Sequence, residues 1–414
     1  MEKGKTGVYL IGALGSISTT VAAGAAALRK GLVPATGMVT CSGIFQGVDL
    51  VGVEDLVFGG CDVRRPEKGS GDIYDRIAPV HPRILREIME DVEQFQAEID
   101  CGCSENCGEA IVGLSSASST CGRSIREEIG TIGSNLKGFK ERHGLDEIVV
   151  VNLASTEPPL EPATCHFDLS ALEECLDGDE KDKVRASTLY AYAAIREGCC
   201  YINFTPSNGA LCPAVVQLAG EKGLPVMGND GKTGETLMKS ALAPMFSYRN
   251  LEVMSWEGFN ILGNMDGQVL NHPENRESKI RTKDQVLPAI LGYSPHTKVR
   301  IDYVPSLEDQ KTAWDFIHFR GFLGAKMSLQ FVWQGYDSIL AAPLVLDMVR
   351  LAVLAKRRGE AGLMPQLAPF FKDPIGVGKH GLSDQMQMLA DYAKKAERPC
   401  KKSTAEARRS QRKV

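Results

Sequence analysis

Short apolar runs alternate with helix-like segments through the first half of this 414-residue chain, and this alternation is the strongest constraint on its fold. The apolar runs predict buried strands at 8–11, 37–40, 57–62, 148–152, 201–204 and 225–227. Helices are predicted at 19–29, 184–196 (amphipathic) and 214–222. Apolar strands joined by helices are typical of parallel sheets covered on both faces, so we expect an α/β fold with a Rossmann-like doubly wound sheet.

The alternation of apolar strands and helices ends after residue 228. A helix is predicted at 233–244, and strands of an open, largely antiparallel sheet are predicted at 251–256, 299–304 and 327–333. This sheet would belong to a second, α+β domain, followed by an apolar helix at 339–356 that returns to the first domain. We therefore expect four parts, bounded as 1–228, 229–336, 337–393 and a basic, disordered tail at 394–414.

Charge and hydropathy exclude several classes of protein. A formal net charge of -5 argues against nucleic acid as the main partner. The most apolar long segment, 339–355, contains Pro343, Asp347 and Arg350, so it predicts a buried helix and no membrane span. The first residues lead straight into an apolar strand and show no signal peptide, so we expect a cytoplasmic protein.

A glycine turn follows the first predicted strand and precedes a helix of small residues. Strand, glycine turn and helix together can hold a dinucleotide pyrophosphate at the helix N-terminus. The candidate contacts are Gly12, Ala13, Leu14, Gly15, Ser16 and Ile17. Because the match to G-x-G-x-x-G is imperfect, a turn that only permits tight packing is the alternative. No acidic residue ends the strand predicted at 37–40, so Asp62 is the candidate for a ribose or adenine contact.

A block rich in carboxylates, carboxamides and lysines extends from Gly228 to Lys283. Groups that are costly to desolvate are rarely gathered only to form a core, so the block predicts a polar pocket for a phosphorylated, hydroxyl-rich ligand. Polar loops also follow two predicted strands, at the end of a sheet where ligands bind. Their candidate residues are Ala154, Ser155 and Thr156 in one loop and, for a phosphate, Ser207, Asn208 and Gly209 in the other, with Lys232.

Four lysines are candidates for proton transfer and for binding an anion. Lys279 and Lys283 share a face if their segment is helical, and neighbouring ammonium groups lose a proton more easily; the alternative is a solvated helix face. Lys311 follows Asp309, whose carboxylate would keep it charged, although a surface ion pair has the same spacing. Lys372 follows two aromatic residues, a pattern also typical of a snorkelling surface lysine. Together they predict a cationic site for a phosphate and an oxyanion.

The twelve cysteines do not resemble a disulfide scaffold in a chain of this length. Cys101, Cys103 and Cys107 cluster, with Cys121 behind them, in a C-x-C-x3-C spacing that is not a usual zinc pattern. The cluster therefore favours a reduced, locally variable loop over a metal site.

Several long segments resemble the myo-inositol-1-phosphate synthase family, also called inositol-3-phosphate synthase, and most closely its short archaeal and bacterial forms. The resemblance extends from about Val8 to about Leu389, and its most specific segments are 152–158, 203–207, 228–236, 255–267 and 309–313. Two features depart from the family: the first loop has fewer glycines, and Gly-Asp-Asp-Phe-Lys-Ser reads Gly-Asn-Asp-Gly-Lys-Thr, as in archaeal forms. The Cys101–Cys107 insert has no counterpart with a known role.

The resemblance implies a bound NAD and the conversion of D-glucose 6-phosphate to 1D-myo-inositol 3-phosphate, for inositol and phospholipid synthesis. Oxidation at C5, enolisation, aldol ring closure and reduction would follow one another without net redox change. The implied catalytic residues are Lys279, Lys283, Lys311, Lys372 and Asp309, with Lys279 acting at C5 and Lys283 and Lys311 at the oxyanion and phosphate. Further implied cofactor contacts are Asp230, Thr233, Asn264, Met265, Asp266, Asp337 and Ser338.

The resemblance also implies a divalent or monovalent cation near the nicotinamide, at Asn260 and Leu262, and a homotetramer formed through the second sheet. Residues 1–228 would bind NAD, and residues 229–336 would carry catalysis and oligomerisation. Two alternatives stay open: a related sugar-phosphate cyclase that makes a different carbocycle, and an NAD-binding regulatory protein without catalysis. Retention of the four lysines argues against the second, and a dehydrogenase with net redox turnover is disfavoured.

Overall fold

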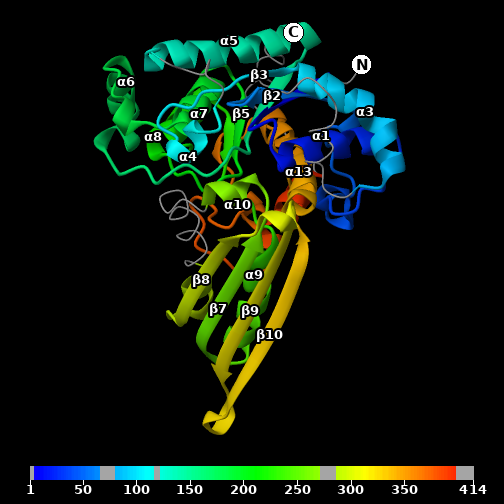
Figure 1. Ribbon diagram of the computed structural model, residues 1–414, viewed down its shortest axis with the longest axis vertical. Coiled ribbons are helices and arrows are strands. Elements are labelled where there is room, and N and C mark those ends of the chain that lie inside the picture. The colour runs from blue at the N-terminus through cyan, green and yellow to red at the C-terminus, as the bar shows by residue number, and fades with distance from the viewer. Residues whose placement is uncertain (1–3, 66–79, 116–121, 271–285, 398–414) are drawn as a thin grey trace, which may run out of the picture.

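The computed structural model describes residues 4–65, 80–115, 122–270 and 286–397. Helices surround a first sheet at one end of the molecule, and a second, elongated sheet extends along the longest axis at the other end (Figure 1). This mixed architecture confirms the predicted α/β class with a second α+β part.

The first sheet has seven strands in the order β11-β6-β5-β4-β1-β2-β3, and its neighbouring strands are parallel. Their bounds are β1 (Thr6–Ile11), β2 (Leu56–Asp62), β3 (Ile99–Cys101), β4 (Glu147–Asn152), β5 (Cys200–Asn203), β6 (Pro225–Met227) and β11 (Gly362–Leu363). The register pairs Ile11 with Asn152, and Asn152 with Asn203, so the carboxyl ends of the three central strands are level.

Helices cover both faces of this sheet, because alternate strand residues point to opposite sides. Val8 and Leu10 of β1 pack in one core cluster with α13 (Asp337–Arg357), which also contacts α1 (Ser16–Arg29). Tyr9 and Ile11 pack in a second cluster with other helices, namely α5 (Ile125–His143), α6 (Leu169–Asp177), α7 (Ala186–Arg196) and α8 (Pro213–Lys222). The sheet is therefore doubly wound, as predicted.

The second sheet has four strands in the order β10-β9-β7-β8. Their bounds are β7 (Glu252–Leu262), β8 (His296–Tyr303), β9 (Gln310–Arg320) and β10 (Lys326–Tyr336). Only the β7–β8 pair is parallel, which fits the predicted, largely antiparallel sheet. One face packs on α9 (Gly234–Tyr248) through an apolar cluster that includes Phe246 and Trp256. The other face leaves Trp314 and Val332 partly exposed.

The chain leaves the first sheet after β6, forms α9 and the second sheet, and returns directly from β10 into α13. The described remainder consists of α3 (Pro82–Ala97), α4 (Glu109–Val112), α10 (Met265–Leu270), α12 (Val286–Leu291), α14 (Leu382–Ala396) and eight short 3-10 turns, among them η1 (Val39–Cys41), η5 (Lys181–Lys183) and η8 (Pro365–Phe370). α13 is long and apolar enough to cross a membrane, but 72% of its most apolar window is buried, as expected of a core helix.

Three predictions of local structure were wrong. Residues 37–40 form a turn leading into η1 and no strand, so β2 is the neighbour of β1. Strand β9 was not predicted, because its apolar residues come in adjacent pairs, Ala313-Trp314 and Phe316-Ile317, and do not alternate strictly with polar ones. Helix α7 is buried on all sides and is not amphipathic, since it lies inside the layer that covers β4 and β5. Of the predicted tail, Lys394 to Ala396 complete α14, and residues 398–414 lie outside the described part.

Asp347 explains why the segment around η1 lies against α13. Its buried carboxylate accepts hydrogen bonds from the backbone N–H groups of Val39 (2.6 Å) and Thr40 (3.1 Å) and from the Thr40 hydroxyl. Side-chain oxygens thus replace the ladder partners that a strand at 37–40 would have had.

We expect Asp347→Ala to lower the free energy of unfolding by about 3 kcal/mol, because it leaves buried donors without an acceptor. Urea unfolding measures the change, with Glu90→Ala on an exposed position of α3 as the matched control. A loss no larger than that of the control would contradict the anchoring role of Asp347.

Candidate active site

A large cavity lies at the carboxyl ends of the first sheet's strands, where the second sheet begins and α13 returns. Its empty volume is about 1440 Å³, which includes space open to solvent. Loops after β1, β2, β4, β5 and β6 contribute to its lining, together with the starts of α10 and α13. The cavity thus lies where doubly wound sheets bind ligands, and it extends to the part of the chain that carries the predicted lysines.

The glycine turn after β1 forms one wall. Gly12 has a φ of 81°, and a Cβ there would lie 2.8 Å from the Ala154 Cα, so no other residue fits without displacing the backbone. The N-cap of α1, Gly15, offers no side chain to the first free N–H groups. Gly12, Gly15, Ser16 and Ile17 line the cavity, whereas Ala13 and Leu14 are buried beneath them. This wall fits a dinucleotide pyrophosphate, because it combines a close backbone approach with an uncapped helix N-terminus.

Asp62 ends β2 and lines the cavity. Its Oδ2 accepts a hydrogen bond from the Leu14 backbone N–H (2.9 Å), and its Oδ1 accepts one from Arg64 Nε (3.0 Å). The sequence suggested that the acidic residue of the second strand was missing, but that strand was placed at 37–40. With β2 at Leu56–Asp62, an acidic residue does end the strand next to β1.

The loop after β4 contributes Ala154, Ser155 and Thr156 to the cavity, as predicted for a strand end. The next residue, Glu157, also lines the cavity and is buried. Its carboxylate accepts hydrogen bonds from the backbone N–H (2.9 Å) and the hydroxyl of Ser187, in the first turn of α7. Burial raises the pKa of Glu157 to about 7, although both hydrogen bonds favour the charged form.

Two lysines form ion pairs with carboxylates that line the cavity. Lys311 Nζ lies 3.0 Å from Asp337 Oδ2, and Lys372 Nζ lies 2.8 Å from Asp230 Oδ1. The lysine side chains are only 12% and 8% exposed, so neither is the surface residue that the sequence allowed as an alternative. The predicted Lys279 and Lys283 lie outside the described residues.

Asp309 is not in contact with Lys311 but joins the starts of α10 and α13. Ser338 donates a hydrogen bond to Asp309 Oδ2 (2.5 Å), and the Asn264 amide donates one to Oδ1 (3.3 Å). Burial raises the pKa of Asp309 against the opposing effect of these hydrogen bonds. Five predicted cofactor contacts of this region line the cavity: Asn264, Met265, Asp266, Asp337 and Ser338.

The N-terminus of α9 forms a second candidate anion site, which the sequence analysis missed. Its N-cap, Thr233, makes no capping hydrogen bond to the helix and instead donates to Asp337 Oδ1 (3.2 Å). A Cβ on Gly234 would lie 3.8 Å from Lys311 Nζ, so the first turn of α9 directly adjoins that ammonium group. The signal in the sequence was Thr-Gly immediately before a predicted helix, within the block already read as polar.

The residues predicted to hold a phosphate do not meet in the cavity. Ser207 lines it, but its Oγ accepts the Glu157 N–H (3.1 Å). Asn208 exchanges two hydrogen bonds with the Leu160 backbone, and Gly209 packs closely against Thr188 of α7. Lys232 is buried beside Gln385 of α14, to which its Nζ donates, and burial lowers its pKa to about 7. These loop residues hold the scaffold together, since their polar atoms are used within the protein.

The cation site predicted at Asn260 and Leu262 stays a prediction, since the buried Asn260 Oδ1 has no hydrogen-bond partner among the described residues. Asn260 donates its amide to Glu235 Oε2 (2.6 Å), and the Leu262 carbonyl accepts the Val304 N–H (3.0 Å). In residues 4–65, 80–115, 122–270 and 286–397, no group of three His, Cys, Asp or Glu side chains is placed to hold a metal.

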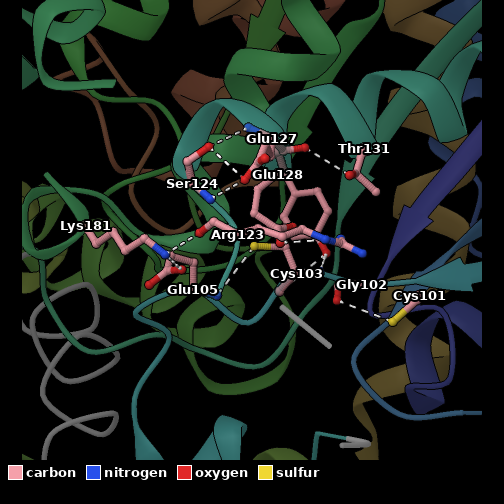
Figure 2. Close-up of polar contacts among 11 residues, drawn as sticks. Cys101, Gly102, Cys103, Glu105, Arg123, Ser124, Glu127, Glu128, Thr131 and Lys181 are labelled. Carbon is pink, nitrogen blue, oxygen red and sulfur yellow. Dashed lines mark hydrogen bonds and ion pairs between the residues drawn. The ribbon is translucent and has the colours of Figure 1, made fainter. Parts of the chain in front are cut away.

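The cysteine insert is built into the fold by several polar contacts (Figure 2). Lys181 of η5 forms an ion pair with Glu105 (3.1 Å) and donates to the Arg123 carbonyl. The Cys101 thiol is exposed, whereas the buried Cys103 Sγ accepts the Glu105 N–H at 3.4 Å. Cys121 lies outside the described residues. Four residues of this region line the cavity: Cys103, Cys107, Ile111 and Leu114.

Comparison with known proteins adds to this geometry. The family model of myo-inositol-1-phosphate synthase matches residues 6–394. The chain is 32% identical over 397 residues to inositol-3-phosphate synthase 1 of Bacteroides thetaiotaomicron, and the match covers 91% of each protein. Two solved structures are similar in fold. One is inositol-3-phosphate synthase from Caenorhabditis elegans, with a TM-score of 0.82 and 23% identity over 96% of this chain and 86% of that one. The other is a myo-inositol-1-phosphate synthase-related protein from Thermotoga maritima, with a TM-score of 0.77 and 26% identity over 94% and 98%.

The raised pKa of Glu157 leads to a prediction for stability. A proton held more tightly in the folded state stabilises it fully below the unfolded pKa, and this contribution is lost as pH rises through about 7. Between about pH 5 and pH 8, we expect the free energy of unfolding of the parent protein to fall by about 2–3 kcal/mol more than that of Glu157→Gln. Glu161→Gln, at an exposed position of the same loop, is the control and should keep the parental pH dependence. Equal slopes for the parent and Glu157→Gln would refute the assignment.

Proposed function

The chain belongs to the myo-inositol-1-phosphate synthase family, and on that premise we propose that it converts D-glucose 6-phosphate to 1D-myo-inositol 3-phosphate with the help of NAD. The observation that carries the proposal is the meeting of two lysine–carboxylate pairs, one buried and one half-buried, with two uncapped helix N-termini beside one cavity. Such a site provides a place for a dinucleotide, a phosphate and a developing oxyanion.

Residues of the first sheet would hold the NAD. The glycine turn and the first N–H groups of α1 suit the pyrophosphate, the end of β2 suits the adenosine, and Asn264, Asp266 and Ser338 lie toward the lysines and suit the nicotinamide end. The bound NAD supplies the oxidation at C5 and the closing reduction, so that no redox equivalent is consumed. The division into an NAD-binding part (1–228), a catalytic part (229–336) and returning helices (337–393) belongs to this proposal.

The α9 N-terminus and Lys311 would bind the substrate phosphate. The N–H groups of the first helical turn and the adjoining ammonium group offer charge-assisted hydrogen bonds to phosphate oxygens. Thr233 and Lys311 both bond to Asp337, so this carboxylate holds the two donors in place before the substrate arrives. This assignment replaces the loop at Ser207 as the proposed phosphate site.

Lys372 would act on the carbon skeleton. Asp230 pairs with its ammonium group beside the cavity, where that group would stabilise the oxyanion that forms when C6 loses a proton. Lys279 at C5, and Lys283 at the oxyanion and phosphate, complete the proposal by family resemblance. No step is assigned to a cation at Asn260 and Leu262, which remains an expectation from the family resemblance alone.

A homotetramer and a cytoplasmic location are proposed on the same resemblance. The partly exposed Trp314 and Val332 on the second sheet support the former, because apolar groups on an open sheet face are typical of interfaces. Neither alternative function is favoured. A regulatory protein would not need two ammonium groups held in buried pairs, and no observation points to a carbocycle other than inositol.

Incubation with D-glucose 6-phosphate and an equal concentration of NAD tests the function directly. We expect phosphorus NMR to show conversion to an inositol monophosphate, while the absorbance of NADH does not grow with the substrate consumed. Stoichiometric NADH would indicate a dehydrogenase, and a different cyclic phosphate would indicate a related cyclase. Either result would contradict the proposal.

We expect Lys311→Ala to lower turnover by about 10³-fold or more, because it removes a charged donor from the proposed phosphate site. The variant should still bind NAD, as followed by calorimetric titration. Lys326→Ala, at an exposed position of β10, is the matched control and should keep the parental rate. A Lys311→Ala variant with nearly parental turnover would exclude Lys311 from the active site.

A further inference from the structure

The carboxylate of Asp62 is fully used by donors of the protein. Its Oδ1 accepts hydrogen bonds from the backbone N–H (2.9 Å) and the Nε (3.0 Å) of Arg64. Its Oδ2 accepts the Leu14 backbone N–H (2.9 Å) and Arg64 Nη2 (3.2 Å). A carboxylate has about four lone-pair sites, so these four hydrogen bonds account for its acceptor capacity.

This arrangement affects whether the site that receives the adenosine ribose distinguishes NAD from NADP. An acidic residue at the end of this strand ordinarily accepts the ribose 2′-hydroxyl of NAD, whereas a nearby arginine accommodates the 2′-phosphate of NADP. Here a ribose hydroxyl could bond to Asp62 only by displacing an existing donor. The negative charge that would repel a 2′-phosphate is neutralised at contact distance by Arg64.

The group presented to the cavity is the guanidinium. The Arg64 side chain is 20% exposed against 3% for Asp62, and both residues line the cavity. Among the described residues, Asp62 accepts one hydrogen bond from Nε and one from Nη2 of Arg64. The remaining N–H groups of the guanidinium, on Nη1 and Nη2, can then donate to a ligand. A planar, permanently charged guanidinium group binds a phosphate better than it binds a hydroxyl.

We propose that the Asp62–Arg64 pair makes the adenosine end tolerant of a 2′-phosphate, so that this protein binds NADP as well as NAD. The inference rests on the proposed function only for the orientation of the dinucleotide, with its adenosine toward the end of β2.

Calorimetric titration of the full chain with NAD and with NADP, without substrate, tests the proposal. We expect the two dissociation constants to lie within about 30-fold of each other, since the pair neither repels the 2′-phosphate nor depends on the free 2′-hydroxyl. A larger preference for NAD would overturn the proposal. Failure of NAD itself to bind would also count against the proposed function, so the two failures are distinguishable.

The variant Arg64→Ser tests whether Arg64 is the residue that makes the site tolerant of a 2′-phosphate. The change uncovers the Asp62 carboxylate, so NADP should bind about 100-fold more weakly while NAD binds as before or more tightly. Retained NAD binding shows that the variant is folded. Arg86→Ser, at an exposed position of α3, is the matched control and should leave the NADP to NAD ratio unchanged. An unchanged ratio in Arg64→Ser would overturn the proposal.

Competition by adenosine fragments gives an independent readout. Adenosine 2′,5′-bisphosphate should displace NAD from the parent protein at least as well as 5′-AMP does. In Arg64→Ser, 5′-AMP should be the better competitor. If 5′-AMP is much the better competitor in the parent protein as well, Arg64 does not receive a 2′-phosphate.

Discussion

An ammonium group that is largely removed from water is stabilised by a carboxylate in contact with it, and two such pairs join parts of this protein that are distant in sequence. Lys311 of β9 pairs with Asp337, the first residue of α13, and Lys372 pairs with Asp230 in the loop after β6. The members of the second pair are 142 residues apart. The pairs therefore join the second sheet and the C-terminal segment to the edge of the first sheet, and the cavity lies between the joined segments.

The same pairs prepare the site for its chemistry. Because each ammonium group is already held by a carboxylate, little reorganisation is needed when a phosphate or an oxyanion arrives. The two uncapped helix N-termini add backbone donors whose positions are fixed by the fold: α1 after β1, and α9 after the polar segment that follows β6. The fold thus places two uncapped helix N-termini beside one cavity, which suits the dinucleotide and the sugar phosphate of the proposed function.

Much of the fold was readable from the sequence, because the central strands of the first sheet are continuous apolar runs. The sequence also placed the glycine turn, Asp62 and the loop at Ala154 at strand ends, and all three line the cavity, although their binding of a ligand stays a prediction. The strand expected at 37–40 failed because a buried side chain, Asp347, satisfies that backbone instead. The structure does not favour the phosphate site predicted at Ser207, whose neighbours are hydrogen-bonded within the protein, and such contacts between residues distant in sequence could not be read from spacing. The spacing of residues in the sequence could not show that Lys311 lies beside the start of α9, or that Arg64 is hydrogen-bonded to Asp62.

The central claim is that the paired lysines and the helix N-termini bind one sugar phosphate beside one NAD. A crystal structure with NAD and D-glucitol 6-phosphate tests it most directly, because this open-chain analogue lacks the C1 aldehyde and cannot cyclise. The account predicts phosphate oxygens within hydrogen-bond distance of Lys311 and the first N–H groups of α9, and a chain hydroxyl at Lys372. A ligand bound elsewhere, with both ion pairs closed and out of its reach, would contradict the account.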